Sequence, residues 1–177
     1  QYRDFGYGKP ILVGRTKNVV DRLHMLGMSD PGSFEIQNSA DSDHVPAMVE
    51  HLYNRLQRRG YTERDVRRMV NQDRNIFGSA LLAIDAGDAM ITGLTRPFAQ
   101  TAKEVATVLD PKEGEVPFGI HLMIGKNYTV FLADTTINER PSSEDLAVIA
   151  TETAAVARRM GHDPRVAFLS YSTFGNP

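Results

Sequence analysis

The sequence predicts an α/β fold with a mostly parallel sheet, and the strongest evidence is a strand–helix–strand pattern near its end. Residues 128–133 mix aromatic and β-branched side chains as a half-buried strand does, and residues 165–169 form a second short apolar run. Between them, Ser142 followed by Asp145 marks the start of a helix, and Gly161 marks its end. The helix has one apolar stripe: Leu146, Ile149, Val156, Ala157 and Met160. Strands joined in this way lie parallel in one sheet.

The rest of the chain alternates short apolar runs with amphipathic segments, which supports the same fold class. The predicted strands are residues 10–13, 34–36, 89–92 and 118–124, the last of which pairs antiparallel with residues 128–133. The predicted helices are residues 16–26, 47–59, 75–85 and 97–110, and a further one that opens at Thr62 with Asp65 as its capping partner. A change of composition at residues 113–117 predicts a first lobe at residues 1–112 and the start of a second at residues 113–177.

Composition excludes several classes of protein. With 177 residues and 41% hydrophobic content, the chain can form one substantial core or parts of two lobes. Its net charge of −2 gives no general attraction for nucleic acid, and no apolar run reaches the length of a membrane span. There is no secretory signal peptide, so we expect a cytoplasmic protein, and the absence of cysteine excludes thiolate chemistry. The chain lacks an initiator Met and ends directly after a candidate ligand loop, so we expect a fragment.

Three segments are candidates for binding a ligand. Two of them, residues 134–138 and 170–176, follow predicted strands, and ligands of parallel sheets lie beyond the carboxyl ends of the strands. The third runs from Gly93 into the helix that Pro97 begins, where free amide groups can hold an anion. The candidate side chains are Thr95, Arg96, Thr101, Lys103, Asp134, Ser170, Ser172 and Thr173. The alternative is that these residues only turn the chain and cap helices, because loops commonly use the same residue types.

Two other patterns are better explained by a solvent-exposed surface. Seven arginines fall within about twenty residues, but acidic residues are interleaved with them, so we expect an exposed or interfacial face with one or two contacts to a diphosphate at most. These are Arg55, Arg58, Arg59, Arg64, Arg67, Arg68 and Arg74. Residues 41–44, DSDH, contain metal-ligating types but lie in a polar turn, and the five histidines have no metal-ligand spacing. We therefore predict no metal site.

The stretches FLADTTINE and RVAFLSYSTFGNP, and the chain as a whole, resemble the phosphate acetyltransferase family. The closer resemblance is to the C-terminal domain of the long bacterial NADP-dependent malic enzymes, since Phe174 precedes Gly175 where stand-alone acetyltransferases tend to have lysine. The resemblance implies a doubly wound, mostly parallel sheet with helices on both faces, in two lobes of the isocitrate/isopropylmalate dehydrogenase type. This chain would supply most of the first lobe and an incomplete second lobe.

In the family, coenzyme A and acetyl phosphate bind between the lobes, and the catalytic serine, arginine and aspartate come from a C-terminal portion that this chain lacks. Two further positions depart from the stand-alone enzymes, which have arginine where this chain has Leu56 and Lys103. A hydrocarbon at the first position removes recognition of phosphate, and lysine at the second keeps only a point charge. The resemblance therefore implies no catalytic residue in this chain and argues against efficient acetyl transfer.

The function that the resemblance implies is a regulatory domain of a malic enzyme, which binds acetyl-CoA or CoA as an effector and self-associates. Thr95, Thr101 and Lys103 would lie on the coenzyme side, and Ser170, Ser172 and Thr173 at the acyl or phosphate end. NADP and a divalent metal would bind only in an absent N-terminal portion, where malate is oxidised. Two alternatives remain: a catalytic phosphate acetyltransferase, and a purely structural assembly domain. Nucleic acid and membrane are not expected as partners.

Overall fold

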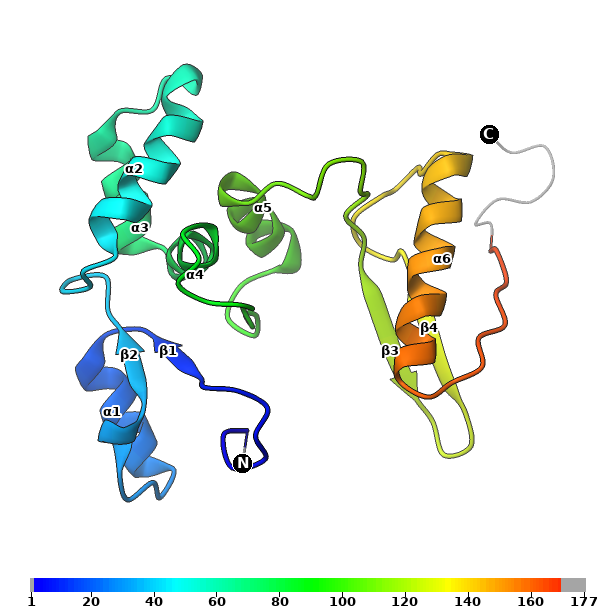
Figure 1. Ribbon diagram of the computed structural model, residues 1–177, viewed down its shortest axis with the longest axis horizontal. Coiled ribbons are helices and arrows are strands. Elements are labelled where there is room, and N and C mark those ends of the chain that lie inside the picture. Colours follow the sequence, from blue (N-terminus) through cyan, green and yellow to red (C-terminus); the bar gives the residue numbers. More distant parts are fainter. Residues whose placement is uncertain (1, 170–177) are drawn as a thin grey trace. The chain divides into compact units, whose positions relative to one another are not determined.

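The computed structural model describes residues 2–169, and it has a mixed α/β architecture (Figure 1). The chain divides into two compact units, Gln1–Asp110 and Pro111–Pro177, here called unit 1 and unit 2. Each unit contains a two-stranded sheet and one or more helices. The sheet of unit 1 is parallel, and the sheet of unit 2 is antiparallel. The units are described separately below.

Unit 1 begins with a strand–helix–strand motif. Strand β1 (Ile11–Val13) leads through Gly14 into helix α1 (Thr16–Met25), and a 3-10 turn, η1 (Pro31–Ser33), precedes strand β2 (Glu35–Gln37). The two strands pair in parallel with Leu12 opposite Ile36. The amide of Gly14 donates to the carbonyl of Gln37 at 3.0 Å, which extends the pairing beyond β1. Their carboxyl ends therefore lie at the same edge of the sheet.

Four helices make up the rest of unit 1: α2 (Val45–Leu56), α3 (Glu63–Gln72), α4 (Arg74–Ala83) and α5 (Phe98–Val108), with a 3-10 turn η2 (Gln57–Arg59) after α2. The predicted capping box at the start of α3 is confirmed. The hydroxyl of Thr62 accepts a hydrogen bond from the amide of Asp65, and the carboxylate of Asp65 accepts one from the amide of Thr62. Gly60 has a φ of 87°, which allows the chain to turn sharply between α2 and α3.

These helices hold the main hydrophobic core. The buried residues come mostly from α2, α3 and α4, and several of them, such as Met48, Leu52 and Val66, have no exposed surface. Val13 of β1 packs against this core and connects the small sheet to the helices. Burial of so many aliphatic side chains is the main force that stabilises unit 1. The buried members are Val45, Met48, Val49, Leu52, Leu56, Val66, Val70, Ile76, Phe77, Ala80, Leu81 and Val108.

Unit 2 contains a β-hairpin and one long helix. Strands β3 (Ile120–Ile124) and β4 (Thr129–Ala133) pair antiparallel across the predicted turn, with Leu122 opposite Phe131. Helix α6 (Ser143–Arg159) contacts β4 and begins with the predicted capping box, in which Ser142 and Asp145 each accept from the other's amide. Gly161 follows the helix with a φ of 84°. These local predictions are confirmed.

Two predicted strands are absent from the described residues, and that part of the prediction is wrong. Residues 89–92 and 165–169 run without a strand partner in the described part of the chain. Phe168 and Leu169 are 65% and 87% exposed, so this apolar run has no sheet to pack on. A strand is stable only when a neighbour supplies hydrogen bonds and a packing surface. The parallel unit predicted from β4 through α6 is therefore not formed in these residues.

The apolar stripe predicted for α6 is correct only in part. Ile149 and Ala157 are buried, together with Ala154, but Leu146 and Met160 are 36% and 51% exposed. The face that carries Ile149 packs on the hairpin, and a two-stranded hairpin is too narrow to cover the whole stripe. None of the described helices is both long enough and apolar enough to span a membrane.

Candidate functional site

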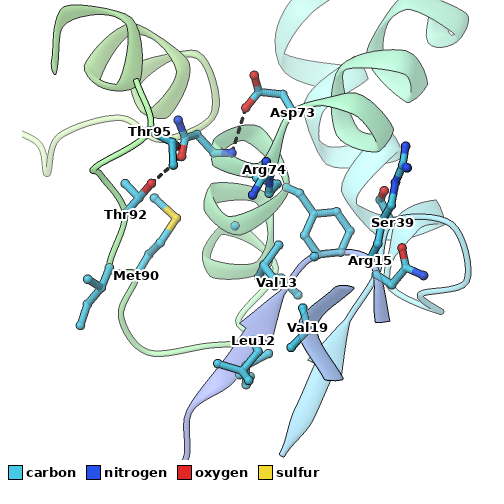
Figure 2. A pocket seen from close by; sticks show the side chains of 18 of the residues that line it. Leu12, Val13, Arg15, Val19, Ser39, Asp73, Arg74, Met90, Thr92 and Thr95 are labelled. Atoms are coloured by element: carbon cyan, nitrogen blue, oxygen red, sulfur yellow. Dashed lines mark hydrogen bonds between the residues drawn. The ribbon is translucent and has the colours of Figure 1, made fainter. Parts of the chain in front are cut away.

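Unit 1 contains a cavity of about 1190 Å³ (Figure 2). Its walls come from four segments: β1 with one side of α1, the turn after β2, the end of α3 with α4 and the residues after it, and the extended residues 89–96. In Figure 2, Met90, Thr92 and Thr95 lie on one side of the cavity, and Arg15 and Ser39 lie on the other. The cavity therefore brings together residues that are far apart in the sequence.

The cavity opens at the carboxyl ends of the parallel strands. Gly14 and Arg15 directly follow β1, Asn38 and Ser39 directly follow β2, and all four line it. Parallel sheets commonly bind their ligands at this edge, because the loops there point polar groups into one crevice. A cavity thus lies beyond the carboxyl ends of β1 and β2, whereas the sequence prediction was made for the strands at residues 128–133 and 165–169.

The floor of the cavity is apolar. Phe77 and Leu81 of α4 are almost fully buried, and Val13 and Met90 flank them. Gly78 lets Met90 lie directly on α4, because a β-carbon at that position would come within 2.6 Å of the methionine sulfur. The floor therefore offers hydrophobic surface, whereas hydrogen-bonding groups are found on the rim.

A hydrogen-bonded network fixes one side of the rim. The guanidinium of Arg96 forms ion pairs with both Asp73 and Glu104. The Asn75 side chain donates to Glu104 at 2.6 Å and accepts from the Thr92 hydroxyl at 2.5 Å. The network ties residues 92–96 to the start of α4 and the middle of α5, and its buried members each have a partner, as buried polar groups require.

Asp73 has a second role in this network because it also caps α4. Its carboxylate accepts from the amides of Asn75 and Ile76 at 2.8 and 3.1 Å. Burial tends to raise the pKa of Asp73, but the hydrogen bonds from Arg96 and from the two amides outweigh burial and hold the pKa below its ordinary value. Asp73 therefore stays ionised at neutral pH and stabilises both the helix and the loop.

Three other arginines line the cavity without such partners. Arg15, Arg22 and Arg74 are exposed, and within residues 2–169 their guanidinium groups form no ion pair or hydrogen bond. Sequence reasoning missed Arg15 and Arg22. The signal that could have found them is their spacing of seven residues, about two helical turns, from the N-cap of α1 to its last turn.

Seven of the eight predicted site residues fall into three groups. Thr95 and Arg96 line the cavity, although Arg96 is held by its two carboxylates. Thr101 is half-buried and Lys103 is exposed on α5, and neither belongs to the cavity wall. Ser170, Ser172 and Thr173 lie outside the described residues. Of the five predicted residues that lie within residues 2–169, two line this cavity.

Asp134, the remaining predicted residue, belongs to unit 2 and binds backbone groups. Its carboxylate accepts from the amides of Gly119, Thr136, Ile137 and Asn138 at 2.8 to 3.2 Å. Burial raises its pKa, but these four bonds outweigh burial and lower the pKa to about 2. The carboxylate joins the segment before β3 to the turn after β4, so its oxygens are already engaged within the fold.

The predicted arginine-rich region is mainly a surface with ion pairs. Arg67 and Arg68 pair with Glu63 and Asp65 on the same helix. Arg55 pairs with Asp110 and donates to the carbonyl of Thr107 at 2.9 Å, which ties α2 to the end of α5. Of the seven arginines in this region, only Arg74 lines the cavity among the described residues.

Two further positions bear on the predicted chemistry. Leu56, which stands where the resemblance implies an arginine, is 1% exposed in the core of unit 1 and does not line the cavity at β1 and β2. Residues 41–44 border a smaller cavity of about 300 Å³ next to β2. Among residues 2–169, no group of three or more histidine, aspartate or glutamate side chains is arranged to hold a metal ion.

Comparison with known proteins shows relatives of two kinds. The chain is 40% identical to an NADP-dependent malic enzyme of Rhizobium meliloti and 39% identical to a probable NADP-dependent malic enzyme of Rickettsia prowazekii, over 99% and 98% of this chain. It is 30% identical to the phosphate acetyltransferase of Bacillus subtilis over 94% of this chain. The chain spans 23% of the length of these malic enzymes and 51% of that acetyltransferase.

Structural comparison gives a consistent result. The EutD phosphotransacetylase from Staphylococcus aureus superposes with a TM-score of 0.76 and 28% identity, over 94% of this chain and 50% of that one. The phosphate acetyl/butaryl transferase family model matches residues 1–177, the whole chain. The extent of this match and the agreement in structure lead to one conclusion: the chain belongs to the phosphate acetyl/butaryl transferase family.

Proposed function

We propose that this chain is a regulatory, acetyl-CoA-binding and oligomerising domain of an NADP-dependent malic enzyme in the cytoplasm. The observation that carries the proposal is the cavity at the carboxyl ends of β1 and β2, with its apolar floor and cationic rim. The sequence relationship supports the malic enzyme branch, since the chain is 39–40% identical to two NADP-dependent malic enzymes but only 30% identical to the phosphate acetyltransferase.

The chemistry of the cavity supports a ligand of the acyl-CoA type. Its volume of about 1190 Å³ is at the upper end for small-molecule sites, which suits a large ligand. Val13, Val19 and Met90, which line the cavity and are only half-buried, offer surface for an acyl or pantetheine chain, and the polar rim offers partners for phosphate. A ligand with both an apolar arm and phosphate groups matches this division of the cavity.

We further propose that the two units are parts of two doubly wound α/β lobes of the isocitrate/isopropylmalate dehydrogenase type, whose sheets are larger in the full-length protein. The support is that unit 1 already has a parallel strand–helix–strand motif with helices packed beside it. The relative with a similar fold is about twice as long as this chain.

Isothermal titration of acetyl-CoA into the full-length protein tests the regulatory role, together with malate turnover measured with and without acetyl-CoA. We expect binding and a decrease in turnover of about five- to fiftyfold, the usual size of coupling between two sites. Absence of binding contradicts the proposal, and so does binding that leaves turnover unchanged. NADP and the divalent metal would be supplied in this assay for the malate site elsewhere in the protein.

A catalytic phosphate acetyltransferase is the second candidate, because the chain matches named acetyltransferases over nearly all its length. Our proposal differs from it in a measurable way: the full-length protein would form essentially no acetyl phosphate from acetyl-CoA and phosphate. The core position of Leu56 and the exposure of Lys103, away from the cavity, favour this expectation. Turnover at a rate typical of enzymes, above about one per second, favours the catalytic alternative instead.

The third alternative, a structural assembly domain, would bind no acetyl-CoA but would still self-associate. Light scattering of the full-length protein and of a variant that lacks this domain measures the contribution to assembly. Loss of the oligomer without any acetyl-CoA binding by the intact protein favours the purely structural role.

A further inference from the structure

We infer that Arg15, Arg22 and Arg74, and not Arg96, hold the phosphate groups of the ligand that occupies the cavity of unit 1. This inference deepens the proposed function and rests on it. It assigns phosphate recognition to Arg15 and Arg22, which the sequence did not indicate, and to Arg74 of the arginine-rich region, and it makes Arg96 a positioning residue. Four steps support it.

The first step is the charge balance around Arg96. Two carboxylates, Asp73 and Glu104, contact the same guanidinium, so its positive charge is already compensated inside the fold. Moving Arg96 toward a ligand would leave both carboxylates without their partner, and removing one member of such a partly buried group is costly. Arg96 therefore holds residues 92–96 in place and does not capture the ligand.

The second step is the position of Arg15 and Arg22. Arg15 is the N-cap residue of α1 and Arg22 follows seven residues later in its last turn; both line the same cavity, as do Asn18 and Val19. Residues at this spacing share a helix face. The face of α1 that meets the cavity therefore has an apolar part and a cationic edge, and no acidic residue of α1 belongs to the cavity wall.

The third step is that Arg74 faces the same space from another element. It lies at the start of α4, next to Asp73, but the carboxylate of Asp73 is engaged by Arg96 and by two backbone amides. Arg74 forms no ion pair within the described residues. Positively charged side chains from the α1 segment and from α4 therefore line the same cavity on different walls.

The fourth step is the overall sign of the cavity. Within the described part of the chain its lining contains four arginines and a single carboxylate, that of Asp73, although the whole chain has a net charge of −2. After Arg96 is compensated, three guanidinium groups remain without a counter-charge. Guanidinium binds phosphate through paired N–H groups, so this lining fits a ligand with more than one phosphate.

The test measures acetyl-CoA affinity in the full-length protein by isothermal titration. The test variants are the double substitution Arg15→Ala with Arg74→Ala, and the single substitution Arg22→Ala. The matched control is Arg58→Ala with Arg64→Ala, which removes the same charge from exposed positions of unit 1 that do not line the cavity. Thermal stability is measured for every variant and also for Arg96→Met.

We expect each cavity arginine to contribute about five- to tenfold in affinity, so that the double variant weakens binding by at least about twentyfold. The control changes affinity less than twofold. Raising the salt concentration weakens binding by the wild type more than binding by the double variant, because exposed charges are screened. Arg96→Met lowers the melting temperature, whereas the Arg15, Arg22 and Arg74 variants leave it unchanged. This difference distinguishes a residue that positions the loop from residues that bind the ligand.

Two outcomes overturn the inference. One is an affinity of the double variant within twofold of the wild type; the other is an equal loss in the control. If the wild type does not bind acetyl-CoA, the proposed function fails, and the same variants are then titrated with inorganic diphosphate. Diphosphate binding that is lost in the double variant and kept in the control upholds the arginine site, and no diphosphate binding to the wild type refutes it.

Discussion

Unit 1 and unit 2 differ sharply in how much of their apolar surface they bury. Unit 1 has a core of twelve buried hydrophobic residues, drawn almost entirely from helices α2, α3 and α4. Among residues 111–169, unit 2 buries only the hydrophobic residues Ile149, Ala154 and Ala157, and strand β3 exposes Met123 and Ile124 by 51% and 76%. The comparison shows that consecutive helices can make a core from a continuous stretch of chain, whereas a sheet needs strands that come from further away.

The largest expected effect is a cavity made in the core of unit 1. Leu52→Ala should lower the free energy of unfolding by about 3 to 5 kcal/mol, because Leu52 is fully buried and its neighbours cannot fill the space. Ile124→Ala in unit 2 is the matched control and should change it by less than about 0.5 kcal/mol. Urea unfolding followed by circular dichroism measures the free energy of unfolding of both variants. Equal decreases in the two variants would contradict the difference in core burial between the units.

The second effect concerns the Asp134 carboxylate, which stabilises unit 2 without a large core. Asp134→Ala should cost about 2 to 4 kcal/mol, because four amides lose their acceptor. Asp134→Asn keeps the shape and one acceptor oxygen and should cost less. Hydrogen exchange of β3, β4 and the following turn reports the loss, and unchanged protection in the alanine variant would show that this carboxylate is dispensable.

Asp134 also makes the stability of unit 2 sensitive to acid. Its pKa is lowered from 3.8 to about 2 in the folded state, so its contribution of about 2 kcal/mol is fully present above pH 4. The contribution is lost as the pH falls toward 2, since the carboxylate then takes up a proton. Urea unfolding between pH 5 and pH 2 should show this loss in the wild type and not in Asp134→Asn.

A smaller effect is expected at the rim of the cavity in unit 1. Arg96→Met should cost about 1 to 3 kcal/mol and raise the pKa of Asp73, because the carboxylate loses its strongest partner but keeps two amide donors. NMR titration of the Asp73 carboxyl carbon measures the pKa. The double variant Arg96→Met with Asp73→Asn should recover part of the stability, and failure to recover any would indicate that the two residues are not coupled.

The smallest effect uses a motif that both units share. Thr62→Ala and Ser142→Ala each remove one capping box and should each cost about 1 kcal/mol. If the two units unfold separately, the first substitution increases hydrogen exchange only in unit 1 and the second only in unit 2. An increase in both units from either substitution would show that they unfold together.

Local signals in the sequence were sufficient for most of the helices. Thr62 and Ser142 mark helix starts because capping depends on residues three positions apart, and the structure contains both boxes. Residues 89–92 and 165–169 have the composition of strands but form none in the described part, since pairing depends on partners distant in sequence. The same dependence on distant strand partners explains why residues 2–169 do not form the larger sheet that the resemblance implies.

The candidate site was harder to predict than the fold. Asp134 follows a strand, as a ligand-binding residue would, but the structure uses it to bind amides on both sides of the hairpin. Arg15 and Arg22 gave no signal as single residues, because their significance depends on which wall of the cavity α1 forms. Sequence patterns reveal the types of residue available, whereas the grouping of side chains depends on tertiary packing.

The two-stranded sheets have a practical consequence for handling the protein. Within residues 2–169 every strand has one neighbour, so each leaves a row of amide and carbonyl groups along its other side. Such borders accept a further strand from any chain that approaches, and the exposed Ile124 and Phe168 would favour contact. Preparations of this segment alone should therefore precipitate more readily as concentration rises than preparations in which neighbouring polypeptide covers those borders.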